Sequence, residues 1–269
     1  MPRFSANITF LFRELPLTQR FNAAREAGFS AVEILSDENT PVEELALACR
    51  SSAMQVALIN VPMGDFIAGG PGLSAVPGRQ TEFREAVCRA IAMAEALACD
   101  KIHIGPSLVP AGSSWHDCYR IYVENVGFAI GKMVDTDITL TLEPLNDLDS
   151  PAVFLHRVEQ ALRVIDELDV PRLMLQFDVY HIAQMEEDYL SLLEANIERI
   201  GHIQIADVPG RGEPGSGTLD FPRLFKRLDQ LGYNGWVGAE YMPSRATVET
   251  LGWFRPFARF PVRKPHGVV

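Results

Sequence analysis

Short runs rich in β-branched residues alternate with longer amphipathic segments along almost the whole chain of 269 residues, and this alternation constrains the fold more than any other feature. The longer segments have the period of helices: residues 82–97 and 153–168 each place apolar side chains three and four positions apart. Strands that alternate with helices in this way form βαβ units and a parallel sheet. Eight strands are predicted, at residues 4–10, 31–35, 55–61, 101–105, 138–143, 173–178, 202–207 and 236–241.

The number and spacing of these strands predict a sheet that closes on itself. A strand recurs about every 33 residues, and eight strand–helix units in roughly 250 residues match an α/β fold, the single-domain (β/α)8 TIM barrel. An open, doubly wound sheet is the alternative. We assign the barrel to residues 1–254. Residues 255–269 are assigned to a basic C-terminal tail, which contains Arg255, Arg259, Arg263 and Lys264 and no acidic residue.

Three connections are longer than the usual loops of such a fold, at residues 62–79, 106–115 and 208–219. Each follows the carboxyl end of a predicted strand. In a barrel these loops lie on the face where active sites are built, so the sequence predicts the functional site there.

The charge balance narrows the choice of partners. Lysine and arginine number 24 against 35 aspartates and glutamates, which gives a net charge of −11. This balance argues against a nucleic-acid partner, because phosphate binding needs a concentrated basic face. No apolar run approaches the roughly 20 residues needed to cross a bilayer, so no membrane partner is expected. A homo-oligomer is the default for a barrel of this kind.

The chain's start and its cysteines indicate the compartment. Residues 1–5 lack a basic segment followed by an apolar run, so we expect no secretory signal and a cytoplasmic protein. The cysteines are widely spaced and form no Cys-x-x-Cys pair, so they are expected to be reduced and mostly buried. They are Cys49, Cys88, Cys99 and Cys118.

Polar residues close four late strands that are otherwise largely apolar. These residues are Glu143, Asp178, Gln204 and Glu240, and in a barrel the carboxyl ends of their strands converge on one axis. Three carboxylates in one pocket raise one another's pKa or require a cation. Together with an amide oxygen they form a hard-oxygen ligand set suited to a divalent metal such as Mg²⁺ or Mn²⁺.

Helix capping is the alternative explanation for these acids. It is plausible for Asp178, and for Asp207 a capping or loop role is at least as plausible as a role in the pocket. It fits Glu143 poorly, because this residue precedes Pro144 and glutamate is a poor N-cap. Glu240, at the end of the last strand, is also a poor fit.

Histidines fall at both ends of the predicted strands. His181 follows Asp178 by three residues on the turn that leaves its strand, where it could face the pocket and contact substrate. His202 is predicted at the start of its strand, near the opposite face, where a packed or hydrogen-bonded side chain is expected. His103, near the carboxyl end of the fourth strand, is intermediate between these two cases.

The loop after the seventh strand matches Gly-x-Gly-x-x-Gly at residues 210–215. It does not open a helix in an early βαβ unit and Pro214 interrupts it, so it does not indicate dinucleotide binding. We expect instead a shaped loop that presents Arg211 to an anionic group, since a guanidinium can grip a carboxylate with two hydrogen bonds. Neither a Gly-x-Ser-x-Gly elbow nor a P-loop occurs.

Several segments give the chain a resemblance to a known family. They are residues 60–65 with 78–79, residues 143–146, residues 176–181, residues 202–207 with 211–215, and residues 235–241. On these segments the chain resembles the hydroxypyruvate isomerases, a branch of the xylose-isomerase-like TIM barrels that also contains 2-oxo-tetronate isomerases and ketose 3-epimerases. The similarity extends from residue 3 to about residue 254.

The resemblance implies roles for individual residues. Glu143, Asp178, Gln204 and Glu240 would ligate one divalent metal, with Glu143 and Glu240 also the acid–base pair. His181 would contact substrate oxygens, and Asn60 would belong to the substrate pocket. Gln204 stands where the wider superfamily usually carries a histidine ligand, and members of the family are not uniformly dependent on metal.

The expected reaction converts hydroxypyruvate to tartronate semialdehyde through an enediol, with a small anionic hydroxy-oxo acid as substrate. Arg211 is the candidate partner for the carboxylate of that substrate, with the metal as the alternative. A 2-oxo-tetronate isomerase or a ketose 3-epimerase with the same site is the alternative, since loops and not motif residues set the substrate. A non-catalytic small-molecule binding protein and a metal-dependent DNA repair nuclease are more remote, the latter because the chain is acidic.

Overall fold

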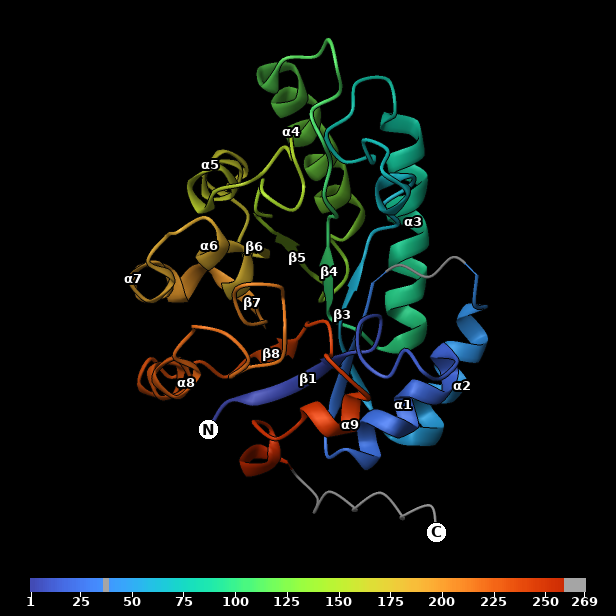
Figure 1. Ribbon diagram of the computed structural model, residues 1–269. Helices are drawn as coiled ribbons and strands as arrows, with labels where there is room; N and C mark the ends of the chain where they lie inside the picture. The colour runs from blue at the N-terminus through green and yellow to red at the C-terminus, as the bar shows by residue number, and fades with distance from the viewer. Residues whose placement is uncertain (36–38, 259–269) are drawn as a thin grey trace.

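Eight parallel strands close into a barrel in the computed structural model, which describes residues 1–35 and 39–258 (Figure 1). Each strand pairs with its neighbours in chain order, and β1 pairs with β8 to close the barrel. The predicted (β/α)8 TIM barrel is confirmed, and the open sheet is excluded. The strands are β1 (Arg3–Asn7), β2 (Ala31–Ile34), β3 (Gln55–Asn60), β4 (Lys101–His103), β5 (Thr139–Leu142), β6 (Leu173–Asp178), β7 (Ile200–Ile205) and β8 (Trp236–Ala239).

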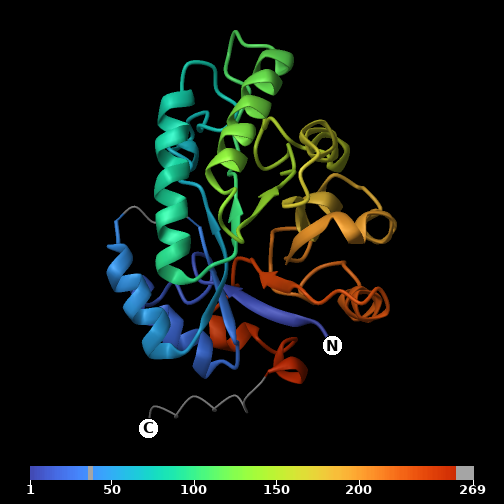
Figure 2. The ribbon, with the colours of Figure 1, turned by 180° about the vertical axis from the view of Figure 1, so that it is seen from behind.

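Helices surround the barrel, and the two longest, α3 and α4, run side by side along one flank (Figure 2). The α-helices are α1 (Leu17–Glu26), α2 (Val42–Ser52), α3 (Gln80–Leu97), α4 (Trp115–Lys132), α5 (Val158–Leu168), α6 (Val179–Gln184), α7 (Tyr189–Asn196), α8 (Phe221–Gln230) and α9 (Thr247–Thr250). Short 3₁₀ helices are η1 (Phe66–Ala68), η2 (Ile197–Arg199) and η3 (Arg255–Phe257). In the described part of the chain no helix combines the length and the apolar composition needed to cross a bilayer.

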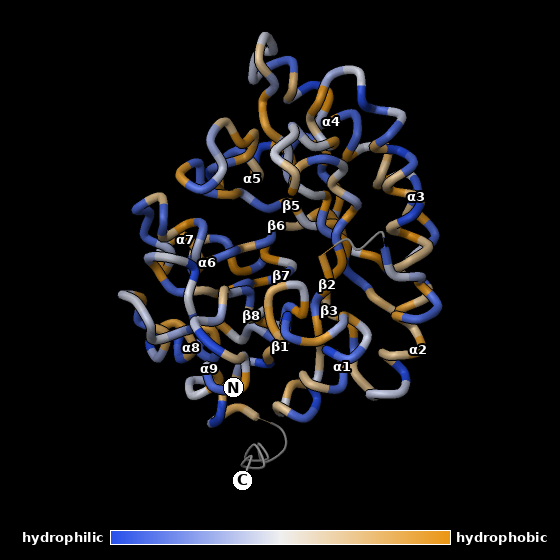
Figure 3. Tube along the Cα trace, turned by 45° about the vertical axis from the view of Figure 1, so that its right-hand side comes forward, coloured by the Kyte–Doolittle hydropathy of each residue, from blue (hydrophilic) through white to orange (hydrophobic). Residues whose placement is uncertain are grey.

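The alternation of side chains along the strands separates two environments. On β7, Ile203 and Ile205 belong to the hydrophobic core, whereas His202 and Gln204 alternate with them and face the other side of the sheet. The same period on β2 separates Val32 from the buried Glu33. Figure 3 shows hydrophobic residues along the central strands and mixed colours along the helices. The polar side of the strands therefore lies inside the barrel, and the apolar side packs against the helices.

Several predicted boundaries are wrong by a few residues. β1 ends at Asn7 because the chain then turns, with Phe10 and Leu11 donating backbone hydrogen bonds to the Asn7 carbonyl at 3.1 and 2.9 Å. β7 begins at Ile200, two residues before the prediction. α5 begins at Val158 and not at residue 153, because the Gln160 side chain accepts backbone hydrogen bonds at the true start of the helix.

The tail boundary at residue 255 falls inside a packed segment. η3 continues from the last turn of the barrel, and the ring of Phe257 lies 5.0 Å from that of Phe4. The rest of the predicted basic tail, residues 259–269, lies outside the described residues. All four cysteines are free, as expected, and three are buried while Cys88 is exposed.

Candidate active site at the carboxyl end of the barrel

A pocket of about 500 Å³ opens at the carboxyl ends of the strands, where the sequence predicted the functional site. Five of the predicted site residues line it: Asn60, Glu143, His181, Arg211 and Glu240. Asp178 and Gln204 are buried behind this lining. The barrel therefore brings together residues that lie as much as 180 positions apart in the chain, from β3 to the end of β8.

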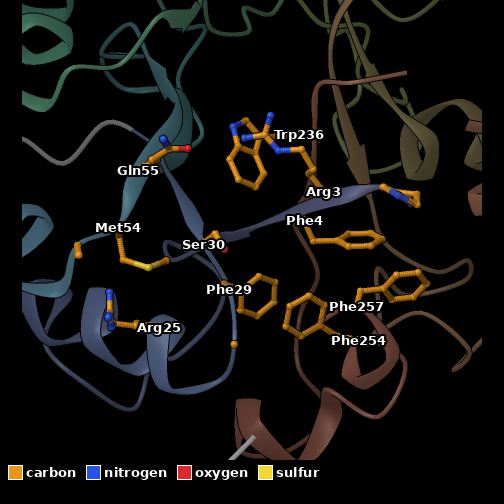
Figure 4. A pocket seen from close by; sticks show the side chains of 13 residues that line it. Arg3, Phe4, Arg25, Phe29, Ser30, Met54, Gln55, Trp236, Phe254 and Phe257 are labelled. Atoms are coloured by element: carbon orange, nitrogen blue, oxygen red, sulfur yellow. The ribbon is translucent and has the colours of Figure 1, made fainter. Parts of the chain in front are cut away.

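A second hollow, of about 640 Å³, lies at the opposite end of the barrel (Figure 4). The guanidinium of Arg3 stacks over the ring of Trp236 at 3.9 Å, and the rings of Phe29 and Phe254 stack at 4.0 Å. Its lining contains neither a carboxylate nor a histidine. Of these two hollows, the one at the carboxyl end therefore holds the groups suited to acid–base and metal chemistry, where a barrel usually has its active site.

Asp178 has two roles that the sequence treated as alternatives. It ends β6 and caps α6, with Oδ1 accepting a hydrogen bond from the backbone N–H of Tyr180 at 2.8 Å. Its other oxygen, Oδ2, is buried and has no hydrogen-bond partner. Arg211 Nη2 and His181 Nε2 each lie 3.5 Å from it, and a buried carboxylate oxygen that accepts no hydrogen bond is costly, so Oδ2 is suited to a bound cation.

Glu143, Asp178 and His181 form a buried cluster that could hold a metal ion. One ligand atom from each lies within 4.8 Å of the others. The Glu143 carboxylate also accepts a hydrogen bond from Gln176 Nε2 at 2.9 Å, and His103 Nε2 lies 3.6 Å from Glu143 Oε2. The carboxylate oxygens of Glu143 and Asp178 are the groups of this cluster that suit a hard divalent cation.

Burial raises the pKa of three carboxyl groups at this site, those of Glu143, Asp178 and Glu240. The pKa of Glu143 is raised well above its usual value, first by burial and then by the negative charges of Glu240 and Asp178. Burial also raises the pKa of Asp178, against the opposing effect of Arg211, and raises that of Glu240 to about 8. Without a bound cation the pocket therefore favours the neutral form of its glutamates.

Arg211 is held in the pocket by aromatic and backbone contacts. Its guanidinium lies 4.9 Å from the ring centroid of Phe10 and 5.2 Å from that of Tyr180. Its Nη2 lies 3.5 Å from Asp178 Oδ2 and 3.3 Å from Glu240 Oε2. The carboxylates that Arg211 faces in this structure belong to the protein, and its contact with the carboxylate of a substrate stays a prediction.

Replacement of Arg211 by lysine is expected to raise KM about tenfold or more, with a smaller loss of kcat. Lysine keeps the charge but loses the planar group that stacks between two rings and reaches two carboxylates at once. Steady-state kinetics with the proposed substrate test this. Arg223→Lys on α8 is the matched control, and equal KM values for both variants would contradict the role of Arg211.

The orientation of His181 is fixed by Asn146. Its Nδ1 accepts the backbone N–H of Asn146 at 3.1 Å and faces the side-chain Nδ2 of the same residue at 2.7 Å. Burial and the charge of Arg211 lower the pKa of His181 well below its usual value, so the ring is neutral. Its proton therefore resides on Nε2, 3.5 Å from Asp178 Oδ2, and this nitrogen is a hydrogen-bond donor toward the pocket.

His103 and His202 are also buried, and His103 lines the pocket whereas His202 does not. Burial, with a smaller effect of His202, lowers the pKa of His103 to about 3. His202 is hydrogen-bonded, as expected, with Nε2 2.9 Å from Glu33 Oε1. Its predicted place at the start of the strand is wrong, because it is the third residue of β7 and lies inside the barrel.

Asp207 organises the loop that carries Arg211. Its carboxylate accepts four backbone hydrogen bonds, all between 2.8 and 3.1 Å. The donors are the N–H groups of Val208, Gly215, Gly217 and Leu219. The loop role considered for this residue in the sequence is confirmed, and the Gly-x-Gly-x-x-Gly match lies within this loop.

Sequence reasoning missed Glu33 and Gln176, which lie inside the barrel beneath the pocket. Each is a polar residue within an otherwise apolar strand, and both are buried. The sequence signal that could have identified them is a polar residue at a position of the strand that faces the barrel interior. The sequence does not show which polar group faces it across the barrel.

The fold and the site agree with the class of protein that comparison with known sequences identifies. A family described as "Xylose isomerase-like TIM barrel" matches residues 21–257, and the chain belongs to this family. Among curated relatives, the hydroxypyruvate isomerase of Escherichia coli is 39% identical over 257 residues, covering 96% of this chain and 100% of that protein. The 2-oxo-tetronate isomerase of Cupriavidus necator is also 39% identical over 257 residues, covering 96% and 99%.

Solved structures show the same fold. A Brucella melitensis protein described as AP endonuclease, family 2, superposes with a TM-score of 0.92 and is 37% identical, covering 96% of this chain and 100% of that one. A 3-keto-D-glucoside 4-epimerase from Escherichia coli superposes with a TM-score of 0.78 at 23% identity, covering 95% and 99%. The enzyme class expected from the sequence, an isomerase, is the class of both curated relatives.

Proposed function

We propose that this protein is an aldose–ketose isomerase that interconverts hydroxypyruvate and tartronate semialdehyde. The observation that carries the proposal is the pair of buried glutamates, Glu143 and Glu240, which line one pocket beside the guanidinium of Arg211. Two curated relatives that cover nearly the whole chain are named for isomerisation of short oxo acids. Such acids are anionic, and the pocket supplies a cationic group for them.

The reaction moves one hydrogen between adjacent carbons. A glutamate carboxylate removes a proton from C3 of hydroxypyruvate, the electron pair of that C–H bond forms the C2=C3 bond, and the π pair of the C2=O bond moves to the C2 oxygen, which gives an enediolate. The same or the facing glutamate returns a proton to C2, while the proton on the C3 oxygen passes to the C2 oxygen. The product is an aldehyde at C3 and a hydroxyl at C2, so the redox change is internal and no external oxidant is needed.

The structure supports separate roles for the two glutamates. Glu143 is fixed by the hydrogen bond from Gln176 and lies 4.0 Å from His181 Nε2. Glu240 lies beside Arg211, whose charge favours its ionised form against the effect of burial. Since the pKa of both groups is raised, a divalent cation at the site would favour the ionised form of one of them, and a carboxylate and a carboxylic acid would then be present together, as proton removal and return require. His181, a neutral donor, is placed to hydrogen-bond a substrate oxygen.

A divalent metal, Mg²⁺ or Mn²⁺, would be held by Glu143, Asp178, Gln204 and Glu240, of which Glu143 and Asp178 belong to the buried cluster. When bound, such a metal stabilises negative charge that develops on substrate oxygens. Asp178 would supply an oxygen that accepts no hydrogen bond, and Gln204 an amide oxygen. The Nε2 proton assigned to His181 makes this residue a donor to substrate and not a ligand.

A 2-oxo-tetronate isomerase is the second candidate, because relatives of both names are equally identical to this chain. The chemistry between C2 and C3 and the roles of the residues would be unchanged. The longer acid would place one more carbon toward the mouth of the pocket, whose apolar lining includes Phe10, Met63 and Phe66.

Turnover of both acids by the purified protein tests the proposal. The protein is treated with a chelator and assayed on hydroxypyruvate and on 2-oxo-tetronate, with and without added Mg²⁺ or Mn²⁺. We expect the higher kcat/KM for hydroxypyruvate, and a loss of about tenfold or more on chelation that Mn²⁺ restores.

The other outcomes point to the alternatives. Preference for 2-oxo-tetronate would change the substrate and keep the mechanism, and turnover of a free ketose alone would indicate an epimerase. Failure to convert any of them, with binding intact, would contradict catalysis and favour a binding protein. An abasic DNA duplex in the same assay tests the nuclease alternative, and we expect it to remain uncut.

A further inference from the structure

Glu33 is a buried glutamate for which the proposed reaction has no use. It lies on β2 with its side chain inside the barrel, where it has no exposed surface, and it is not among the residues that line the pocket. Three donors surround its carboxylate: Ser5 Oγ at 2.6 Å, His202 Nε2 at 2.9 Å and Gln204 Nε2 at 2.9 Å. A buried acid with this many partners is built into the structure.

The barrel makes room for this carboxylate. Gly238 on β8 lies against it, and a methyl group in place of the glycine hydrogen would overlap the Glu33 oxygens. Glycine within a strand often marks such a close approach. The position of Glu33 is therefore fixed by the backbone of β8 as well as by its three donors.

The side-chain amide of Gln204 donates a hydrogen bond at one end and accepts one at the other. Its Nε2 donates to Glu33 Oε2, and its Oε1 accepts from Gln176 Nε2 at 2.6 Å. The same Gln176 nitrogen donates to Glu143 Oε2, and Gln176 Oε1 accepts from Thr141 at 2.8 Å. A chain of hydrogen bonds thus connects Glu33 with Glu143 through the side-chain amides of Gln204 and Gln176.

A carboxylate can only accept, and this decides the direction of the chain. If the Gln204 amide rotated by 180°, its oxygen would face the Glu33 carboxylate and its NH₂ would face the NH₂ of Gln176. Both contacts would then be repulsive, and two buried groups would lose their partners. Glu33 therefore keeps the amide nitrogen of Gln204 facing Glu33 and the amide oxygen facing Gln176.

We infer that Glu33 is a positioning residue that keeps the Gln204 oxygen turned away from Glu33, toward Gln176 and the proposed metal site. The inference rests on the proposed function in one respect, namely that the amide oxygen of Gln204 serves as a ligand. Outer partners of this kind orient the ligands of a metal, and their loss commonly lowers metal affinity about 10- to 100-fold. Ser5 and His202 in turn hold Glu33 in place.

Glu33→Gln tests the inference with almost no change of shape. The amides of residues 33 and 204 can then pair in either direction, so the Gln204 oxygen is no longer fixed. Mn²⁺ binding, measured without substrate by electron paramagnetic resonance and calorimetry, is expected to weaken about 10- to 100-fold. Glu167→Gln on α5, which also removes one negative charge and one hydrogen-bond acceptor, is the control and should retain the wild-type Kd.

A second variant that again fixes the direction of the hydrogen bond between residues 33 and 204 should restore the affinity for Mn²⁺. In the double variant Glu33→Gln with Gln204→Glu, the amide of residue 33 donates to a carboxylate whose other oxygen faces the site. We expect its Kd for Mn²⁺ to return to the wild-type value or below. If the single variant fails to fold, this exchanged pair still decides the question, because a folded double variant that does not bind Mn²⁺ overturns the inference.

A purely structural role for Glu33 predicts a different result. The Glu33→Gln variant would then lower Tm but keep its Kd for Mn²⁺ within about twofold of wild type, and this result would overturn the inference. Absence of Mn²⁺ binding by the wild-type protein would overturn it as well. Because the measurement needs no turnover, a protein that binds Mn²⁺ but fails on both oxo acids would contradict the proposed function and leave the role of Glu33 supported.

Discussion

Replacement of Glu240 by glutamine is expected to lower kcat for hydroxypyruvate about 10²- to 10⁴-fold, the usual contribution of a general acid or base. Glutamine has nearly the same shape, so it fills the same position beside Arg211. It cannot take up or release a proton, and the transfer between C2 and C3 then loses one of its two groups. Substrate binding should change only a few-fold, because the rest of the pocket is unaltered.

Two measurements separate proton transfer from a role in metal binding. Assay at saturating Mn²⁺ shows whether the loss persists when the metal site is filled, and NMR in D₂O follows exchange of the C3 hydrogen directly. Glu249→Gln, at an exposed position on α9, is the matched control and should keep the wild-type rate. If the kcat of Glu240→Gln recovers at high Mn²⁺, Glu240 acts only as a metal ligand. If the variant has the wild-type kcat without added Mn²⁺, Glu240 has no role in catalysis.

Replacement of Asp207 by alanine is expected to lower the free energy of unfolding by about 3–5 kcal/mol. The side chain is fully buried and accepts four backbone N–H groups of one loop. Removal leaves those donors without partners in a space too tight to rearrange easily, because Gly217 lies against the Val208 carbonyl. KM should rise as well, because the same loop carries Arg211.

Urea unfolding compares this variant with Asp220→Ala, which removes the N-cap of α8. Asp220 accepts a single backbone N–H, from Arg223, so its loss should cost about 1 kcal/mol. An equal loss for the two variants would contradict the role assigned to Asp207. Asp207→Asn retains one oxygen and is expected to lie between them.

The two glutamates and Asp178 could be found from sequence because strands have a simple local signal. An apolar run that ends in a carboxylate stands out, and a parallel barrel brings all such ends to one face. The same reasoning placed His181 and Arg211 in the pocket. Their partners could not be found in this way: the guanidinium of Arg211 contacts Asp178, 33 positions earlier, and Glu240, 29 positions later.

The buried polar residues beneath the pocket, such as Glu33, were harder to recognise in the sequence. Glu33 contacts His202, 169 positions away in the chain, and Gln204, 171 positions away. A lone polar residue in an apolar strand indicates that a partner exists, because burial without one is costly. It does not identify the partner, since that depends on which inward positions of distant strands share a layer of the barrel.

The sequence by itself determined the (β/α)8 barrel, the end of the barrel that carries the pocket and five of the residues that line it. These follow from the alternation of strands and helices and from the period of two along a strand, which are properties of short segments. The tertiary structure alone decided strand register, the direction of the Gln204 amide, the tautomer of His181 and the pKa shifts of the buried carboxyl groups. Each of these depends on distances between groups that only the closure of the barrel brings together, in an interior from which water is excluded.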